Sequence, residues 1–233
     1  MRKPSLAAAI FMCALGAGVL GIRTGSIPVP PASLPWTPLD VTAPPNFWTR
    51  HKLARLSDDR AMCRTVLDLT TLDYEPVPDV STGRGCGFSN AVLIKGTPSD
   101  VGEEFPITCR TAVSLALWER HVVQPAARRH FGQAVSGIEH FGSYSCRNVY
   151  GRPAATRSRH ATAEAWDVAG FVLADGTRIR VARDWRGDSA TAVFLREVRD
   201  GACQYFDGVL SPDYNAAHRD HLHLDRGPYR LCR

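Results

Sequence analysis

The sequence lacks several patterns that would assign its 233 residues to a common functional class. It has no run of lysine and arginine interleaved with aromatic residues, which argues against nucleic acid as the main partner. None of its seven cysteines stands in a CxxC pair, so a cysteine zinc ribbon or a thioredoxin-like redox motif is disfavoured. It has no internal repeat, and no glycine-rich loop followed by Lys-Ser/Thr. The remaining composition, 44% hydrophobic and 22% charged with a net charge of +5, is that of a globular protein.

The N-terminus has the pattern of a targeting segment. Arg2 and Lys3 precede an apolar run over residues 6–22, and Arg23 closes it. A charged start followed by an apolar stretch is typical of a secretory signal, and this run is also near the shortest length that spans a bilayer. No small-x-small cleavage site follows. Residues 1–23 are therefore expected to be either a signal peptide or a single-span membrane anchor through residues 6–22.

Either alternative predicts that the rest of the chain is exported, and is periplasmic or anchored to the inner membrane facing the periplasm. Residues 24–46 are rich in proline and have no sustained periodicity, which is typical of a semi-rigid spacer. We expect a proline-rich linker over residues 24–58 and a folded domain over residues 59–233.

The number and distribution of the cysteines support the prediction of export. Six of them are spread through the exported part, and an even number in an oxidising compartment predicts three disulfides. Proximity along the sequence favours the pairs Cys63–Cys86, Cys109–Cys146 and Cys203–Cys232.

Hydrophobic patterning predicts a mixture of helices and strands. Residues 109–132 read as an amphipathic helix broken near Pro125, and residues 189–206 as a helix with Phe194 and Val198 facing inward. Residues 141–147 alternate like a strand. Residues 165–185 form a hairpin with Asp175-Gly176 at its turn, and residues 221–225 form a final strand. This order predicts an α+β fold, with a small antiparallel sheet flanked by helices and stapled by disulfides.

The last strand carries a pair of histidines. Residues two apart in a strand face the same side, so His221 and His223 point together while Leu222 and Leu224 enter the core. Taken alone, the pair is equally well explained as the polar face of a half-exposed strand.

A second cluster changes that balance. His160 lies in a loop that leads into the hairpin, and Asp167 lies at the start of the first hairpin strand, where a carboxylate is costly to bury without a partner. If this strand pairs with the terminal one, His160, Asp167 and one of the two histidines converge. Two imidazoles and a carboxylate form a mononuclear zinc site with a position open for water. The alternative is that Asp167 caps a turn and His160 is merely exposed.

These residues resemble a known family. Ser158-x-His160-x4-Ala165-x-Asp167, followed by His221-x-His223, is similar to the zinc peptidases grouped around D-alanyl-D-alanine carboxypeptidases and lysostaphin. "GSYSCRN", "SRHATAEAWDVAGFVLADG" and "DYNAAHRDHLHLD" resemble bacterial proteins with an extensin-like C-terminal domain. The resemblance covers about residues 60–233 and implies a D-Ala-D-Ala metallopeptidase-like fold. The peptidase pattern usually has glycine where this chain has Ala163, an exchange that removes no ligand.

The resemblance also implies roles for particular residues. His160, Asp167 and His223 match the ligands of Zn²⁺, and His221 matches the histidine that assists the water. Asp220 stands where some relatives have a glutamate base, so Asp220 and His221 compete for that role. His221 is favoured because it shares the strand face with His223.

Three further residues have two interpretations each. Arg147 matches an arginine that steadies the substrate carbonyl, and it is otherwise a solvated residue at a strand end. Asp225 and His218 are expected to be surface groups, with orientation of the ligand rings as the alternative.

The function implied is an exported zinc-dependent peptidase that hydrolyses peptidoglycan stem or cross-link peptides. Zinc would lower the pKa of water from ~15.7 towards ~7, His221 or Asp220 would accept its proton, and Arg147 would stabilise the oxyanion. The alternative is a non-catalytic module that keeps the fold and binds the cell wall. The third interpretation is a structural domain held by disulfides, in which the cluster of histidines and aspartate has no function.

Overall fold

Strand β7 (Ala165–Leu173) is the centre of the largest sheet in this computed structural model, which describes residues 5–57 and 59–233. The strand order is β11-β9-β10-β7-β6, and β8 also pairs with β7. All pairs are antiparallel except β11 with β9. These strands are β6 (Val135–His140), β8 (Arg178–Arg180), β9 (Gly208–Leu210), β10 (Leu222–Asp225) and β11 (Leu231–Cys232).

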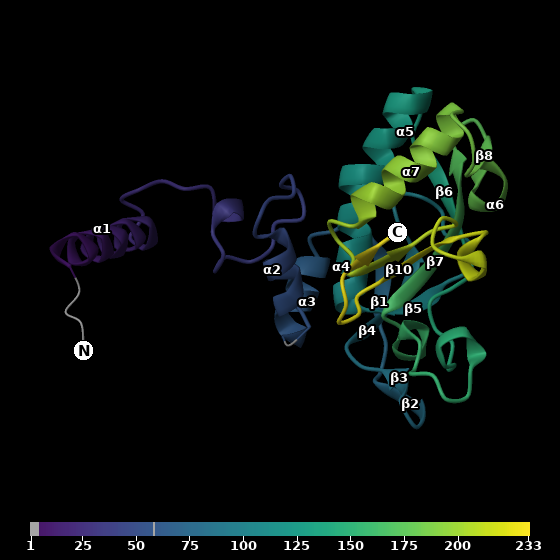
Figure 1. Ribbon diagram of the computed structural model, residues 1–233, viewed down its shortest axis with the longest axis horizontal. Coiled ribbons are helices and arrows are strands. Elements are labelled where there is room, and N and C mark those ends of the chain that lie inside the picture. Colours follow the sequence, from purple (N-terminus) through teal and green to yellow (C-terminus); the bar gives the residue numbers. More distant parts are fainter. Residues whose placement is uncertain (1–4, 58) are drawn as a thin grey trace.

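Two smaller sheets complete an α+β fold (Figure 1). One has the order β1-β4-β5, and the other is the hairpin of β2 and β3. Their bounds are β1 (Asp73–Pro76), β2 (Val80–Gly83), β3 (Cys86–Phe88), β4 (Ala91–Gly96) and β5 (Phe105–Thr108). The helices of the domain are α2 (Thr49–Arg55), α3 (Arg60–Leu67), α4 (Cys109–Trp118), α5 (Gln124–Phe131), α6 (Val181–Asp184) and α7 (Ala190–Ala202).

Aromatic residues join the helices to β7. The ring of Trp118 in α4 lies 6.5 Å from Trp166 and 6.0 Å from Phe171, both on β7 and fully buried. In Figure 1, α5 and α7 run side by side, and Phe131 meets Phe194 between them at 5.3 Å. This core fixes the position of the strand that carries Asp167.

Most of the predicted elements are confirmed. Residues 109–132 form α4 and α5, but the break is a π-helical turn at Glu119–Val123, just before Pro125. Proline lacks the amide hydrogen for the next α-helical bond, so the turn before it widens. The β7–β8 hairpin turns at Asp175-Gly176, and α7 buries Phe194 and Val198.

Two strand predictions are wrong. Residues 141–147 are a loop because Gly142 adopts a φ of +90°, which turns the chain away from β7 just after Phe141 has bonded to Asp167. β10 is not the final strand: the chain returns as β11 beside β9, where the Cys203–Cys232 disulfide holds it.

The disulfides are Cys63–Cys109, Cys86–Cys146 and Cys203–Cys232, so two of the predicted pairs are wrong. The physical reason is packing between distant segments. Helix α3 lies against α4, which brings Cys63 to Cys109, and the β2–β3 hairpin meets the 141–147 loop, which brings Cys86 to Cys146.

The segment before residue 59 contributes to the packed domain. Leu39, Val41, Leu53 and Leu56 are buried in the core. Lys52 is 3% exposed, and its ammonium donates to the backbone carbonyls of residues 31, 32 and 38. The proline-rich chain therefore wraps around one buried lysine.

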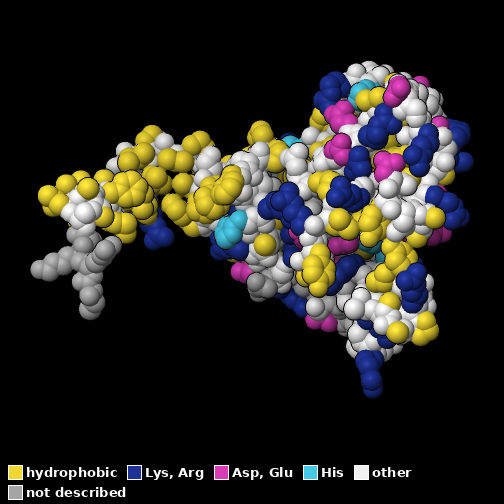
Figure 2. All heavy atoms as spheres, in the orientation of Figure 1, with side chains coloured by type: hydrophobic (Ala, Val, Ile, Leu, Met, Phe, Trp, Pro, Cys, Tyr) yellow, Lys and Arg dark blue, Asp and Glu magenta, His cyan; other side chains and the backbone are white. Residues whose placement is uncertain are grey.

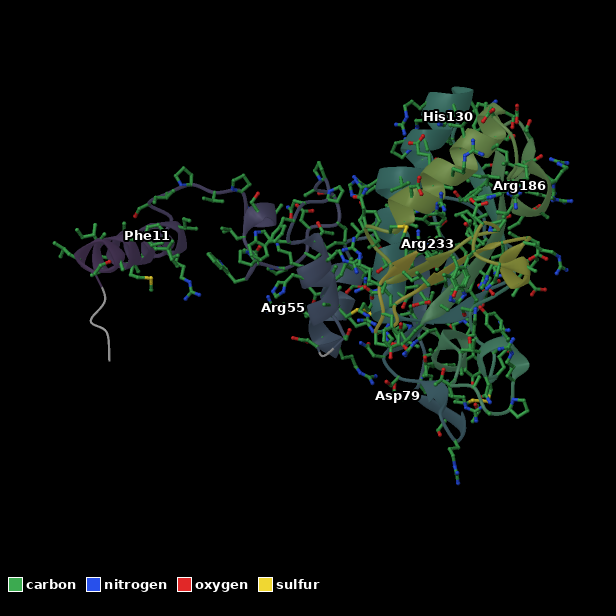
Figure 3. The ribbon with its side chains drawn as sticks, in the orientation of Figure 1. Phe11, Arg55, Asp79, His130, Arg186 and Arg233 are labelled. Atoms are coloured by element: carbon green, nitrogen blue, oxygen red, sulfur yellow. A yellow bond between two sulfur atoms is a disulfide. The ribbon has the colours of Figure 1, made fainter. Side chains whose placement is uncertain are left out.

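Helix α1 (Leu6–Arg23) lies apart from the domain and buries none of its residues. Its mean hydropathy of 2.0 and its length fit a membrane span or a signal sequence. Hydrophobic side chains cover it in Figure 2, and Figure 3 shows Phe11 on this helix, far from Arg233. Arg2 and Lys3 lie outside the described residues.

Candidate metal centre

The pairing of β10 with β7 places His223 directly opposite Asp167. Directly opposed residues of an antiparallel pair have neighbouring side chains on one face, and His223 Nδ1 lies 2.8 Å from Asp167 Oδ1. Leu222 and Leu224 alternate to the other face and are fully buried. The strand periodicity that predicted this arrangement is confirmed here.

His160 reaches the same point from a 3-10 helix, Arg159–Thr162, that leads into β7. The Ser158 side chain caps this turn by accepting from the His160 amide at 3.3 Å. His160 Nε2 lies 3.1 Å from Asp167 Oδ2 and 3.1 Å from His223 Nδ1. All three side chains are buried or nearly so, with exposed fractions of 4%, 8% and 11%.

The outer nitrogen of each histidine has its own acceptor. His160 Nδ1 donates to the Ser143 carbonyl at 2.8 Å, and His223 Nε2 donates to Asp225 Oδ2 at 3.0 Å. A neutral imidazole that carries its hydrogen on one nitrogen presents a lone pair on the other. His160 Nε2, His223 Nδ1 and an Asp167 oxygen therefore converge as electron-pair donors.

The pKa values of His223 and Asp167 show a positive charge held beside a negative one. Burial lowers the pKa of His223, but hydrogen bonds to Asp167 and Asp225 outweigh it and raise that pKa to about 9. Burial alone would raise the pKa of Asp167, whereas hydrogen bonds from His160 and His223 hold it well below its usual range. Without an ion, His223 therefore carries a proton on Nδ1 that Asp167 accepts, and a metal ion would take the place of this proton.

The donor set fits zinc. Donor atoms of His160, Asp167 and His223 all lie within 4.8 Å of one another. A tetrahedral ion with ligand bonds of about 2.0–2.1 Å holds its ligand atoms about 3.3 Å apart, close to the 2.8 to 3.1 Å contacts of this cluster. Two imidazoles and one carboxylate leave a fourth position for a non-protein ligand.

His221 and Asp220 act as a pair in this geometry. Asp220 Oδ1 lies 2.9 Å from His221 Nδ1, and His221 Nε2 faces the cluster at 3.6 Å from Asp167 Oδ1. The two residues that the sequence presents as competitors are hydrogen-bonded to each other, and His221 is the one with a contact to Asp167.

Arg147 lies in the 141–147 loop and is exposed. It lines two hollows whose walls also include His160 and Asp167, so the structure places it beside the cluster. The Cys86–Cys146 disulfide anchors the residue just before it.

Comparison with known proteins places the chain in a family. The family described as extensin-like protein C-terminus matches residues 61–233, which is most of the chain. The chain belongs to this extensin-like family. Neither a curated protein nor a solved structure matches it.

In this extensin-like chain, Asp225 and His218 are not the surface groups that were expected. Asp225 is fixed by His223 and by the Gly227 amide. His218 is 8% exposed because a short 3-10 helix, Ala216–His218, folds it over the cluster, with its ring 5.3 Å from that of His221. Burial, followed by the charges of the neighbouring histidines, lowers the His218 pKa to about 4.

Two residues of the extensin-like site were not found by sequence reasoning. Ser143 acts through its backbone carbonyl on His160, a role that leaves no mark on residue type. Phe141 lies against His221 with ring centroids 5.7 Å apart. A third position, Ala163, has a φ of +52°, the left-handed region that favours glycine. This backbone gives a physical reason for the glycine that is usual there in the peptidase pattern.

Proposed function

We propose that this extensin-like protein is an exported zinc-dependent peptidase that hydrolyses peptidoglycan stem or cross-link peptides. One observation carries the proposal: three electron-pair donors, from His160, Asp167 and His223, converge while the outer nitrogens of both histidines are held by acceptors. This is the arrangement that fixes ligand tautomers at metal sites. Zinc would be held by these three residues.

The residues around the cluster support hydrolysis as the reaction. When bound, zinc would lower the pKa of a water molecule towards neutrality and polarise the peptide carbonyl. His221 accepts a proton at Nε2, since its Nδ1 is engaged by Asp220. His221 then returns this proton to the leaving nitrogen. Arg147 donates to the carbonyl oxygen as negative charge develops there.

Export is supported by two features. The apolar helix α1 fits a signal peptide or anchor, and the three disulfides fit an oxidising compartment. We place the domain in the periplasm, either free or attached to the inner membrane through residues 6–22.

The test is zinc content together with hydrolysis of purified muropeptides by the full chain. We expect one zinc per chain and release of peptide fragments, with both lost in His160→Ala. His51→Ala, at an exposed histidine on α2, is the matched control and should change neither. Zinc binding without cleavage of any muropeptide would instead support a cell-wall-binding module. Absence of zinc from the intact chain would overturn both.

A further inference from the structure

The proposed peptidase site opens into two hollows rather than one. The first has a volume of about 390 Å³ and the second about 360 Å³. Four residues line both of them: Arg147, His160, Asp167 and His221. Two of the three candidate metal ligands, His160 and Asp167, therefore lie where the two hollows meet, and His223 lines the first hollow.

Beyond the shared wall, the hollows diverge. The first continues to Tyr214 and Tyr229, and the second continues to Phe141 and Tyr144. Tyr229 is 82% exposed and Phe141 is 62% exposed, so each hollow ends at an accessible aromatic side chain. Exposed aromatic rings of this kind offer large, rigid contact surfaces to a ligand.

From this arrangement we infer that the substrate is a peptide that continues on both sides of the scissile bond, so that the enzyme is an endopeptidase. The inference rests on the proposed function. Each volume lies within the range of about 300–1,000 Å³ that is typical of ligand sites. An enzyme that removes single terminal residues would leave one hollow without an occupant.

The charges of the lining residues agree with an internal bond. A site that releases a terminal residue has to bind a terminal carboxylate, and a free cation at the far end of one hollow is the complementary charge for it. In the first hollow, Arg159 Nη1 pairs with the Glu164 carboxylate at 3.0 Å. Arg157 has no carboxylate partner among the described residues, but it donates its guanidinium hydrogens to the Asn148 side chain and to the Arg84 carbonyl. Arg147 stands at the junction instead of at an end.

The second hollow disfavours a terminal carboxylate directly. Asp220 lies on its wall, and its negative charge repels another carboxylate. Hydrolysis at the junction of the two hollows adds water across the C–N bond of an internal amide. The carbonyl carbon gains the hydroxyl, the nitrogen gains a proton, and both products remain peptides.

The first experiment compares a cross-linked muropeptide dimer with its monomer. The dimer extends on both sides of the bridging amide, whereas the monomer ends close to its last bond. We expect the full chain to split the dimer into monomers without trimming the monomer. We also expect the His221→Ala variant to bind the dimer at least tenfold more tightly than the monomer. Release of a terminal residue from the monomer with the dimer left intact would overturn the inference but not the proposed function.

A pair of matched variants tests the two hollows separately. Phe141→Ala and Tyr229→Ala each remove an exposed aromatic ring, one from each hollow. In the His221→Ala background, each should weaken dimer binding severalfold without changing zinc content. Only one of them should weaken monomer binding. If both weaken monomer binding equally, the site is not two-sided. If the chain neither binds nor cleaves either muropeptide, the proposed function fails together with this inference.

Discussion

Asp225 Oδ2 accepts a hydrogen bond from His223 Nε2 at 3.0 Å, on the side of the ring opposite the contact with Asp167. The carboxylate is itself held in place, because the Gly227 amide donates to Oδ1 at 2.6 Å. This bond holds one His223 hydrogen on Nε2, so that Nδ1 is the nitrogen that can give up its proton to a metal ion.

Asp225→Ala should therefore weaken zinc binding about 10- to 100-fold, the usual effect of losing such an outer partner. The dissociation constant is measured by competition with a chelator. Asp188→Ala removes a fully exposed carboxylate and is the control. An unchanged zinc affinity in Asp225→Ala would show that the bond does not set the tautomer.

His221 and Asp220 should behave as one unit in catalysis. His221→Ala should reduce kcat by about 10²–10⁴-fold, the typical contribution of a positioned acid–base group, while zinc remains bound. Asp220→Asn should have a smaller effect because Asp220 acts through the His221 ring.

The double variant should be no slower than His221→Ala alone, since residues that act together are not additive. Steady-state kinetics on one muropeptide substrate measures all three variants. A double variant slowed by the product of the two single effects would mean that Asp220 acts independently.

Loss of the Cys86–Cys146 disulfide should lower kcat more than it lowers zinc affinity, because this disulfide anchors the loop that carries Arg147. Replacing both cysteines with alanine should lower the free energy of unfolding by about 2–4 kcal/mol. It should also lower kcat while zinc stays stoichiometric.

The control replaces Cys63 and Cys109 with alanine in the same way. The Cys63–Cys109 disulfide joins α3 to α4, and its sequence separation of 46 residues is comparable to the 60 residues of Cys86–Cys146. Unfolding is followed by denaturant titration, and kinetics are taken at a temperature where both variants remain folded. If both variants lose activity equally, the disulfide has no particular role at Arg147.

Glu119 should make stability depend on pH. This carboxyl is 1% exposed, and its Oε1 accepts from Ser99 and Gln124 at 2.7 and 3.3 Å. Burial raises its pKa above the ordinary value of 4.5. Below pH 4.5 both the folded and unfolded states are protonated. As pH rises through the folded pKa, only the folded state must ionise a buried group, so its stability falls by about 1.4 kcal/mol per unit of pKa shift.

Glu119→Gln should remove this loss, so its stability relative to the original chain should rise between pH 4 and pH 8. Urea unfolding at several pH values measures the difference. Glu104→Gln, at an exposed position, is the control. A constant difference between Glu119→Gln and the original chain over this range would contradict the prediction.

Strand alternation makes part of the candidate site predictable from the sequence. A prediction that His221, His223 and Asp167 lie together requires only strand alternation and one correct strand pairing. The register of β10 and β7 confirms that pairing. The partnership of Asp220 with His221 was not visible, because it depends on side-chain orientation at the start of a strand.

Long-range contacts account for most of what the sequence did not reveal. Cys63 is nearer in sequence to Cys86 than to Cys109, yet the packing of α3 against α4 decides its partner. The alternation of residues 141–147 favoured a strand, but a single glycine at residue 142 redirects the backbone. The sequence predicts a surface position for His218, because nothing in its own segment shows that the segment folds over the cluster.

The position of β7 has a consequence for how fast the proposed metal site would exchange an ion. β6 runs along one edge of this strand while β10 and β8 occupy the other, so we expect the backbones of Asp167 and His223 to be among the last to open. His160 stands on a short turn outside the sheet. We expect ion release to begin at His160, so that loop opening sets the lifetime of the bound ion while the sheet sets its affinity.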